Sequence, residues 1–118
     1  MMRHHSITLF VVAMVASCTT SSDDTTCPRD EPMSCPTPSP SYAADVAPLI
    51  ETYCSPCHNP QGSAFNIQLS TYTALYDLRS EALDQIYDCN MPMLPALQPT
   101  TADRVTLLAW FVCGAPDN

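Results

Sequence analysis

Apolar residues recur at helical spacing in several short segments of the sequence, and the segment near the C-terminus shows this most clearly. Its apolar positions are Val105, Leu108, Ala109 and Val112. Thr100 and Asp103 lie where a capping box begins a helix. Gly114 and Pro116 are typical of the end of one. The pattern therefore predicts an amphipathic helix between the capping box and Gly114.

A shorter amphipathic helix is predicted over residues 45–53. Asp45 is a favourable N-cap residue, and Pro48 falls within the first turn. One face of this helix carries Val46, Leu49, Ile50 and Tyr53. Two further short helices are predicted over residues 71–78 and 81–87. Their inward-facing positions are Leu75, Leu78, Leu83 and Ile86.

Residues 41–118 are therefore expected to form one all-α domain. No segment shows the sustained alternation of apolar and polar residues that is typical of a strand. We expect three to five short helices joined by irregular loops. A domain this small rarely buries enough apolar surface by itself, so disulfides, a metal or a cofactor should supplement the core.

The first 17 residues have the pattern of an export signal. A start containing Arg3 precedes an apolar run from Ile7 to Ala16, which is too short to span a bilayer. The run ends in Val-Ala-Ser-Cys at Cys18, which resembles the bacterial lipoprotein signal. The resemblance implies removal of residues 1–17 and lipid attachment at Cys18. An ordinary secretory signal is the alternative, and either interpretation places the protein outside the cytoplasm.

Residues 18–40 are predicted to be a tether. They show no apolar periodicity and are rich in Ser, Thr and Pro, a composition that favours extended backbone. Cys27 and Cys35 lie eight positions apart in this segment and would close a small loop as a disulfide. An oxidising compartment permits such a bond.

Charge narrows the range of partners. The chain has 4 Lys and Arg against 12 Asp and Glu, a formal net charge of −8. Nucleic-acid binding needs clustered positive charge, which this chain lacks. We therefore expect protein partners, and a membrane contact only through a lipid anchor.

The motif that carries chemistry is Cys54-Ser55-Pro56-Cys57-His58. This C-x-x-C-H pattern is the attachment motif of c-type haem. Cysteines three apart on a helical turn face the same way, so both thiols can add to the vinyl groups of one porphyrin. The following residue, His58, then supplies the proximal iron ligand.

Three other interpretations of the motif remain open. A redox-active C-x-x-C of thioredoxin type expects a βαβ unit, which the sequence does not indicate. A zinc site would need Cys89 or Cys113 as further ligands. The third is a plain disulfide next to a solvated histidine.

Methionine is the natural candidate for the sixth iron ligand. After signal removal His58 is the only histidine, and the chain has no lysine. The mature methionines are Met33, in the tether, and Met91 and Met93, in Asn-Met-Pro-Met-Leu-Pro. Met91 and Met93 lie in a loop that its prolines stiffen, so ligation by either would cost little conformational entropy. Filling gaps in the core is the alternative role for both.

Residues 41–118 resemble a small class I cytochrome c. The resemblance rests on an amphipathic helix before CSPCH, a loop with Gly62, middle helices, the CNMPM loop and a final helix with Trp110. It implies one covalent haem c held by Cys54, Cys57 and His58. The ligating methionine of the family usually precedes a proline, which matches Met91, whereas Met93 stands where a second proline is common. Met93 is therefore the alternative ligand.

The resemblance extends to exported cytochrome c domains of bacterial lipoproteins, which implies that Cys89 and Cys113 pair. Cys27 would then pair with Cys35, and no cysteine would be left over. The aromatic residues expected to pack in the core or around the haem are Tyr53, Phe65, Trp110 and Phe111. Arg79 or Arg104 would either neutralise haem propionates or lie solvated on the surface.

The function implied is that of an electron carrier in the periplasm or cell envelope, and not that of an enzyme. It would exchange single electrons with redox proteins that have a basic docking face. Two other functions stay open: a haem-based sensor or ligand binder with an open sixth position, and a zinc- or disulfide-stabilised interaction module without haem.

Overall fold

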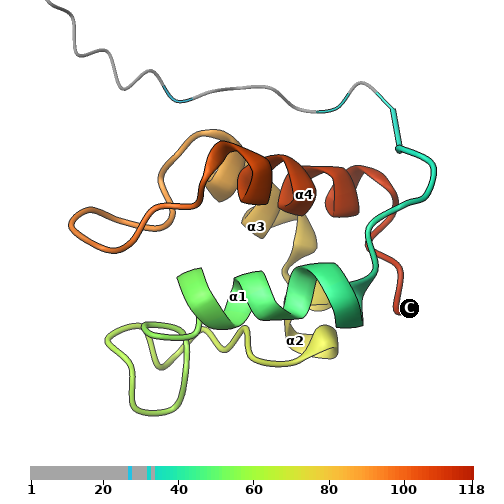
Figure 1. The fold of residues 1–118 in the computed structure, drawn as a ribbon. Helices are drawn as coiled ribbons and strands as arrows, with labels where there is room; N and C mark the ends of the chain where they lie inside the picture. The colour runs from blue at the N-terminus through green and yellow to red at the C-terminus, as the bar shows by residue number, and fades with distance from the viewer. Residues whose placement is uncertain (1–26, 28–31, 33) are drawn as a thin grey trace, which may run out of the picture.

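The computed structural model describes Cys27, Pro32 and residues 34–118, and these residues form helices and loops without a strand (Figure 1). The elements in chain order are a π-helical turn η1 (Tyr42–Val46), α1 (Ala47–Tyr53), α2 (Tyr72–Asp77), α3 (Arg79–Tyr87) and α4 (Thr101–Val112). The expectation of an all-α domain is confirmed for this part of the chain. The signal peptide predicted over residues 1–17 and the predicted lipidation site Cys18 lie outside the described residues. No helix found within these residues has the length and apolar character needed to cross a membrane.

The first helical segment begins earlier than the sequence predicted. Its N-cap is Ser41, whose hydroxyl accepts a hydrogen bond from the Ala44 amide, and not Asp45. The Asp45 carboxylate instead accepts a bond from the Ser41 amide at 2.8 Å. Each side chain therefore satisfies one backbone donor at the start of the turn, that of Ala44 or that of Ser41, in an arrangement similar to a capping box. The π-helical turn then passes directly into α1, where Pro48 lies in the first turn, as predicted.

The other helices confirm the predicted positions to within a few residues. Thr71 and Thr100 cap α2 and α4 by accepting bonds from the amides of Ala74 and Asp103. Both helices therefore begin where a threonine side chain replaces the missing intrahelical partner. Gly114 ends α4 with a φ of 86°, a conformation that glycine adopts without steric cost.

Helix α4 is the centre of the core. It packs against α3 and η1, and Figure 1 shows it lying across from α1. The largest fully buried side chains are Trp110, Leu75, Leu107, Leu108 and Val46. Val105 was expected to face inward but is 40% exposed. The buried stripe includes Arg104 and Leu107 instead, because α4 contacts neighbours over more of its circumference than one narrow face.

An aromatic cluster joins the two ends of the domain. The rings of Tyr42, Tyr72 and Trp110 contact one another, with centroids 5.1 to 6.3 Å apart. The chain beyond α4 folds back here, where Ser41 and Ala43 both donate to the carbonyl of Asn118. The C-terminus therefore lies beside the start of η1 (Figure 1).

The disulfide pairing differs from the one expected. Cys27 is bonded to Cys89, and Cys35 to Cys113, so the pairs Cys27 with Cys35 and Cys89 with Cys113 were wrong. The physical reason is the length of α4. Cys89 follows the end of α3, next to Arg104 in the first turns of α4, whereas Cys113 ends α4, about 13 Å further along the helix axis. Bonded cysteines need Cα atoms within about 7 Å.

The segment predicted as a tether is consequently attached to the helical domain at two points. Cys27 and Cys35 lie against opposite ends of α4, a distance that eight residues of chain can span. The two disulfides therefore attach these two cysteines to the helical domain near the two ends of the helix. They also account for four of the seven cysteines.

Candidate functional site

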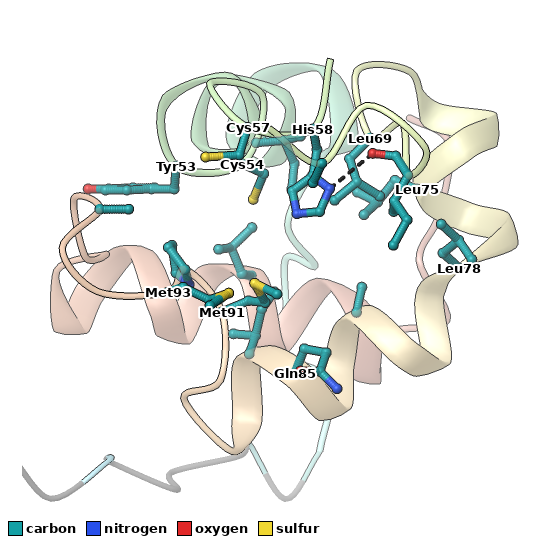
Figure 2. Close-up of a pocket in the computed structure, with 18 of the residues that line it drawn as sticks. Tyr53, Cys54, Cys57, His58, Leu69, Leu75, Leu78, Gln85, Met91 and Met93 are labelled. Carbon is teal, nitrogen blue, oxygen red and sulfur yellow. Dashed lines mark hydrogen bonds between the residues drawn. The ribbon is translucent and has the colours of Figure 1, made fainter. Parts of the chain in front are cut away.

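A cavity of about 540 Å³ lies between the turn that follows α1 and the loop between α3 and α4. Its walls are mostly apolar, and they include Ile50, Leu69, Leu75, Leu78, Ile86 and Leu107. Figure 2 shows Cys54, Cys57 and His58 on one side of this cavity and Met91 and Met93 on the other. The four residues predicted to bind haem and the alternative ligand Met93 therefore lie around one space. Its volume falls within the range of small-molecule and cofactor sites.

The two cysteines and the histidine come together because the chain continues to turn after α1 ends at Tyr53. The amides of Cys57 and His58 both donate to the carbonyl of Cys54, at 3.1 and 2.9 Å. These bonds close a helical turn over the motif. Cysteines three apart are thereby placed on the same side of the backbone.

The ring of His58 is oriented by a backbone carbonyl. His58 is 8% exposed, and its Nδ1 lies 3.0 Å from the carbonyl oxygen of Ile67 (Figure 2). A carbonyl accepts but does not donate, so the proton of the neutral ring is on Nδ1 and the lone pair is on Nε2. Metal-binding histidines typically make such a bond with the nitrogen that does not bind the metal.

The chemistry of Cys54 differs from that of a reactive thiol. Burial, with a smaller contribution from the neighbouring Cys57, raises the pKa of the Cys54 thiol to about 11. Catalytic C-x-x-C cysteines instead have lowered pKa values and partly exposed thiolates. Both Cys54 and Cys57 are free thiols in this structure. The thioredoxin-type interpretation is therefore disfavoured by the environment of Cys54 as well as by the fold.

The zinc interpretation also loses its further ligands. Cys89 and Cys113 are both in disulfides, which cannot supply a thiolate. Within the described residues, no three His, Cys, Asp or Glu side chains lie close enough together to hold a metal ion. The zinc site considered for the motif would need Cys89 or Cys113 as a further thiolate ligand.

The methionine loop is fixed at its start by the last turn of α3. The amides of Asn90 and Met91 both donate to the carbonyl of Gln85, at 2.9 and 3.1 Å. Further along the loop, the Gln98 side-chain amide donates to the carbonyl of Pro92. Met91 is half-buried, whereas Met93 is 64% exposed. The backbone of Met91 is therefore bonded to α3, whereas that of Met93 is bonded within its own loop, where its carbonyl accepts from the Ala96 amide; both side chains line the cavity.

Gly62 is required by a close approach within the loop that follows the motif. A Cβ at this position would overlap the carbonyl oxygen of Cys57, which already accepts a bond from the Ala64 amide. We expect Gly62→Ala to lower the free energy of unfolding by about 1–3 kcal/mol, because the loop must shift away from the motif. Urea denaturation measures this change. Ser63→Ala, at an exposed neighbouring position, is the control, and equal stabilities would contradict the predicted clash.

The aromatic residues and arginines expected near the site have different positions. Tyr53 lines the cavity and donates its hydroxyl to Asp103 at 2.7 Å, while Trp110 and Phe111 are buried in the core. Phe65 is 64% exposed and does not line the cavity, so its predicted packing in the core or around the haem was wrong. Neither Arg79 nor Arg104 lines the cavity: Arg79 stacks on Tyr76, and Arg104 is buried between α3 and α4.

Two backbone groups of the site had no signal in the sequence. The carbonyls of Ile67 and Gln85 orient His58 and Met91, yet any residue type provides a carbonyl. Comparison with known proteins adds no further residue, because no family model, curated protein or solved structure matches this chain.

Proposed function

We propose that this chain is a monohaem c-type cytochrome, which carries single electrons outside the cytoplasm and is attached to a membrane by lipid on Cys18. The observation that supports this most directly is the arrangement of one cavity. Cys54, Cys57 and His58 line one side and Met91 lines the other (Figure 2). These are the four residues that covalent attachment and two axial ligands require.

The residues around the cavity fit a haem in three respects. Cys54 and Cys57 are the free thiols of the described chain, while the other cysteines in this part form disulfides. The Nε2 lone pair of His58 is left for a metal because Nδ1 is committed to a carbonyl. The remaining walls are mostly apolar, which suits a porphyrin ring.

Each residue then has a definite role. Cys54 and Cys57 would hold the haem by thioether bonds, and His58 and Met91 would bind its iron. When bound, the haem supplies a centre that gains and loses one electron, and a methionine ligand raises its reduction potential. The protein fixes both ligands through backbone carbonyls and excludes water with the apolar wall.

The charge of the chain suits a particular kind of redox partner. With a net charge of −8, the protein should associate with a partner that has a basic docking face. Association should slow as salt is added, because the long-range attraction is screened. Export and a lipid on Cys18 would place this encounter in the periplasm or cell envelope.

Redox titration together with exposure to carbon monoxide separates a carrier from a ligand-binding sensor. We expect one reversible one-electron transition in the holoprotein, and no change in the reduced spectrum under carbon monoxide, because Met91 would already bind the iron where the gas would bind. The Met91→Ala variant, which would free this place, is the positive control for carbon monoxide binding. A parent protein that binds the gas as readily as the variant would favour the sensor.

A further inference from the structure

We infer that Arg104 is a positioning residue for Met91: its guanidinium holds the end of α3, from which the methionine loop begins. The inference deepens the proposed function and rests on it for the identity of Met91 as a ligand. Arg104 does not line the cavity, so it would act only through the backbone that carries Met91.

The guanidinium of Arg104 lies where the last carbonyls of α3 need partners. It is 6% exposed, and it donates from Nη1 to the carbonyl of Ile86 and from Nη2 to that of Tyr87, the latter at 2.8 Å. Carbonyls in the last turn of a helix lack intrahelical donors and lie at the negative end of the helix dipole. One planar cation therefore satisfies two such groups and attaches α3 to α4.

The same cation lies beside the disulfide that ends this turn. Nη2 of Arg104 is 3.6 Å from Sγ of Cys27, which is bonded to Cys89. The Cys89 amide donates to the Ile86 carbonyl, the same oxygen that receives Nη1 of Arg104. The guanidinium and the disulfide therefore act on one short segment.

This segment leads directly to the ligand. Met91 lies two residues after Cys89, and its amide donates to Gln85, one residue before Ile86. A displacement of the last turn of α3 must therefore move the backbone of Met91. Because Arg104 joins α3 to α4 here, its two hydrogen bonds to the carbonyls of Ile86 and Tyr87 set the position of the methionine relative to the rest of the core.

The two hydrogen bonds require the planar guanidinium group of arginine, and a positive charge alone is not sufficient. Two carbonyls from successive residues are reached by two nitrogens of one rigid plane, which the single nitrogen of lysine cannot reproduce. Loss of the Nη2 bond takes the charged donor from the Tyr87 carbonyl, whereas the Ile86 carbonyl keeps the bond from the Cys89 amide. Lysine should therefore restore only part of the effect.

The test uses the full-length holoprotein with Arg104→Gln and Arg104→Lys. The control is Arg79→Gln, which removes an exposed cation that also donates to a carbonyl, that of Tyr76. Three quantities are compared: the far-red methionine-to-iron band, the affinity for added imidazole, and the exchange rate of the Met91 amide with deuterium. The first two report ligation by methionine, and the third needs no haem.

For Arg104→Gln we expect a weakened band, about tenfold tighter imidazole binding and faster exchange at Met91. Arg104→Lys should give intermediate values, and Arg79→Gln should match the parent. The inference would be overturned if both Arg104 variants had the imidazole affinity and the Met91 exchange rate of the parent protein, even if their thermal stability fell. If glutamine prevents folding, the lysine variant decides alone by the same criteria. A parent without covalent haem would instead overturn the proposed function, while the exchange rate still tests the link from Arg104 to Met91.

Discussion

Met91→Ala is expected to abolish the far-red methionine-to-iron band of the holoprotein and to lower its reduction potential on the order of 100 mV or more. The reason is that a thioether favours the reduced iron, and alanine leaves its place to water or to no ligand. The backbone hydrogen bond to α3 and the burial of the side chain both favour Met91 over Met93 as the ligand. Its amide is bonded to the Gln85 carbonyl, and its side chain is half-buried at the cavity.

Met93→Ala is the matched control, because it removes the same side chain two positions away in the same loop. Met93 is 64% exposed. We therefore expect the band and the potential of this variant to stay close to those of the parent. Loss of the band in Met93→Ala, with the band kept in Met91→Ala, would reverse the assignment of the sixth ligand.

Removal of either disulfide is expected to cause the largest loss of stability. The bonds close sequence separations of 62 and 78 residues. For loops of that length the entropy of the unfolded chain alone predicts a loss of about 4 kcal/mol for each bond. Urea unfolding of Cys27→Ser with Cys89→Ser, and of Cys35→Ser with Cys113→Ser, measures the two effects separately.

The two disulfide variants should differ at the haem even where their stabilities are similar. Cys89 lies two residues before Met91, whereas Cys113 is at the opposite end of α4. Only the first double variant should weaken the methionine band. Peptide mapping of the parent protein provides the check on the pairing itself: a fragment that joins Cys27 to Cys35 would contradict this account.

The helices were predictable because their signals are local. Thr100 caps α4 and Gly114 ends it, and leucine spacing placed the two middle helices within a few residues. The start of the first helix was missed, since Ser41 and Asp45 are both good caps and the choice depends on a π-helical turn. That turn is supported by Asn118, which is distant in sequence. The exposure of Val105 was missed because it depends on which helices surround α4.

In the candidate site, too, the features with local sequence signals were predictable, and those that depend on tertiary structure were not. The C-x-x-C-H spacing and the Met-Pro loop identified residues that the fold brings to one cavity. The disulfide pairs were wrong because the eight-position spacing of Cys27 and Cys35 suggested a local loop, whereas their partners depend on how Cys89 and Cys113 are placed at opposite ends of α4. Arg104 was considered for haem propionates, yet its burial against the carbonyls of α3 is a tertiary property.

The measurement that tests the central claim most directly is the pyridine haemochrome of the full-length protein, made in a periplasm with haem-attachment machinery and extracted with acidified acetone. The account predicts one haem per chain that stays with the protein, with the α-band of a haem whose two vinyl groups have both reacted. Cys54→Ser with Cys57→Ser should lose this haem to the solvent. A parent protein that retains no haem after extraction would contradict the account.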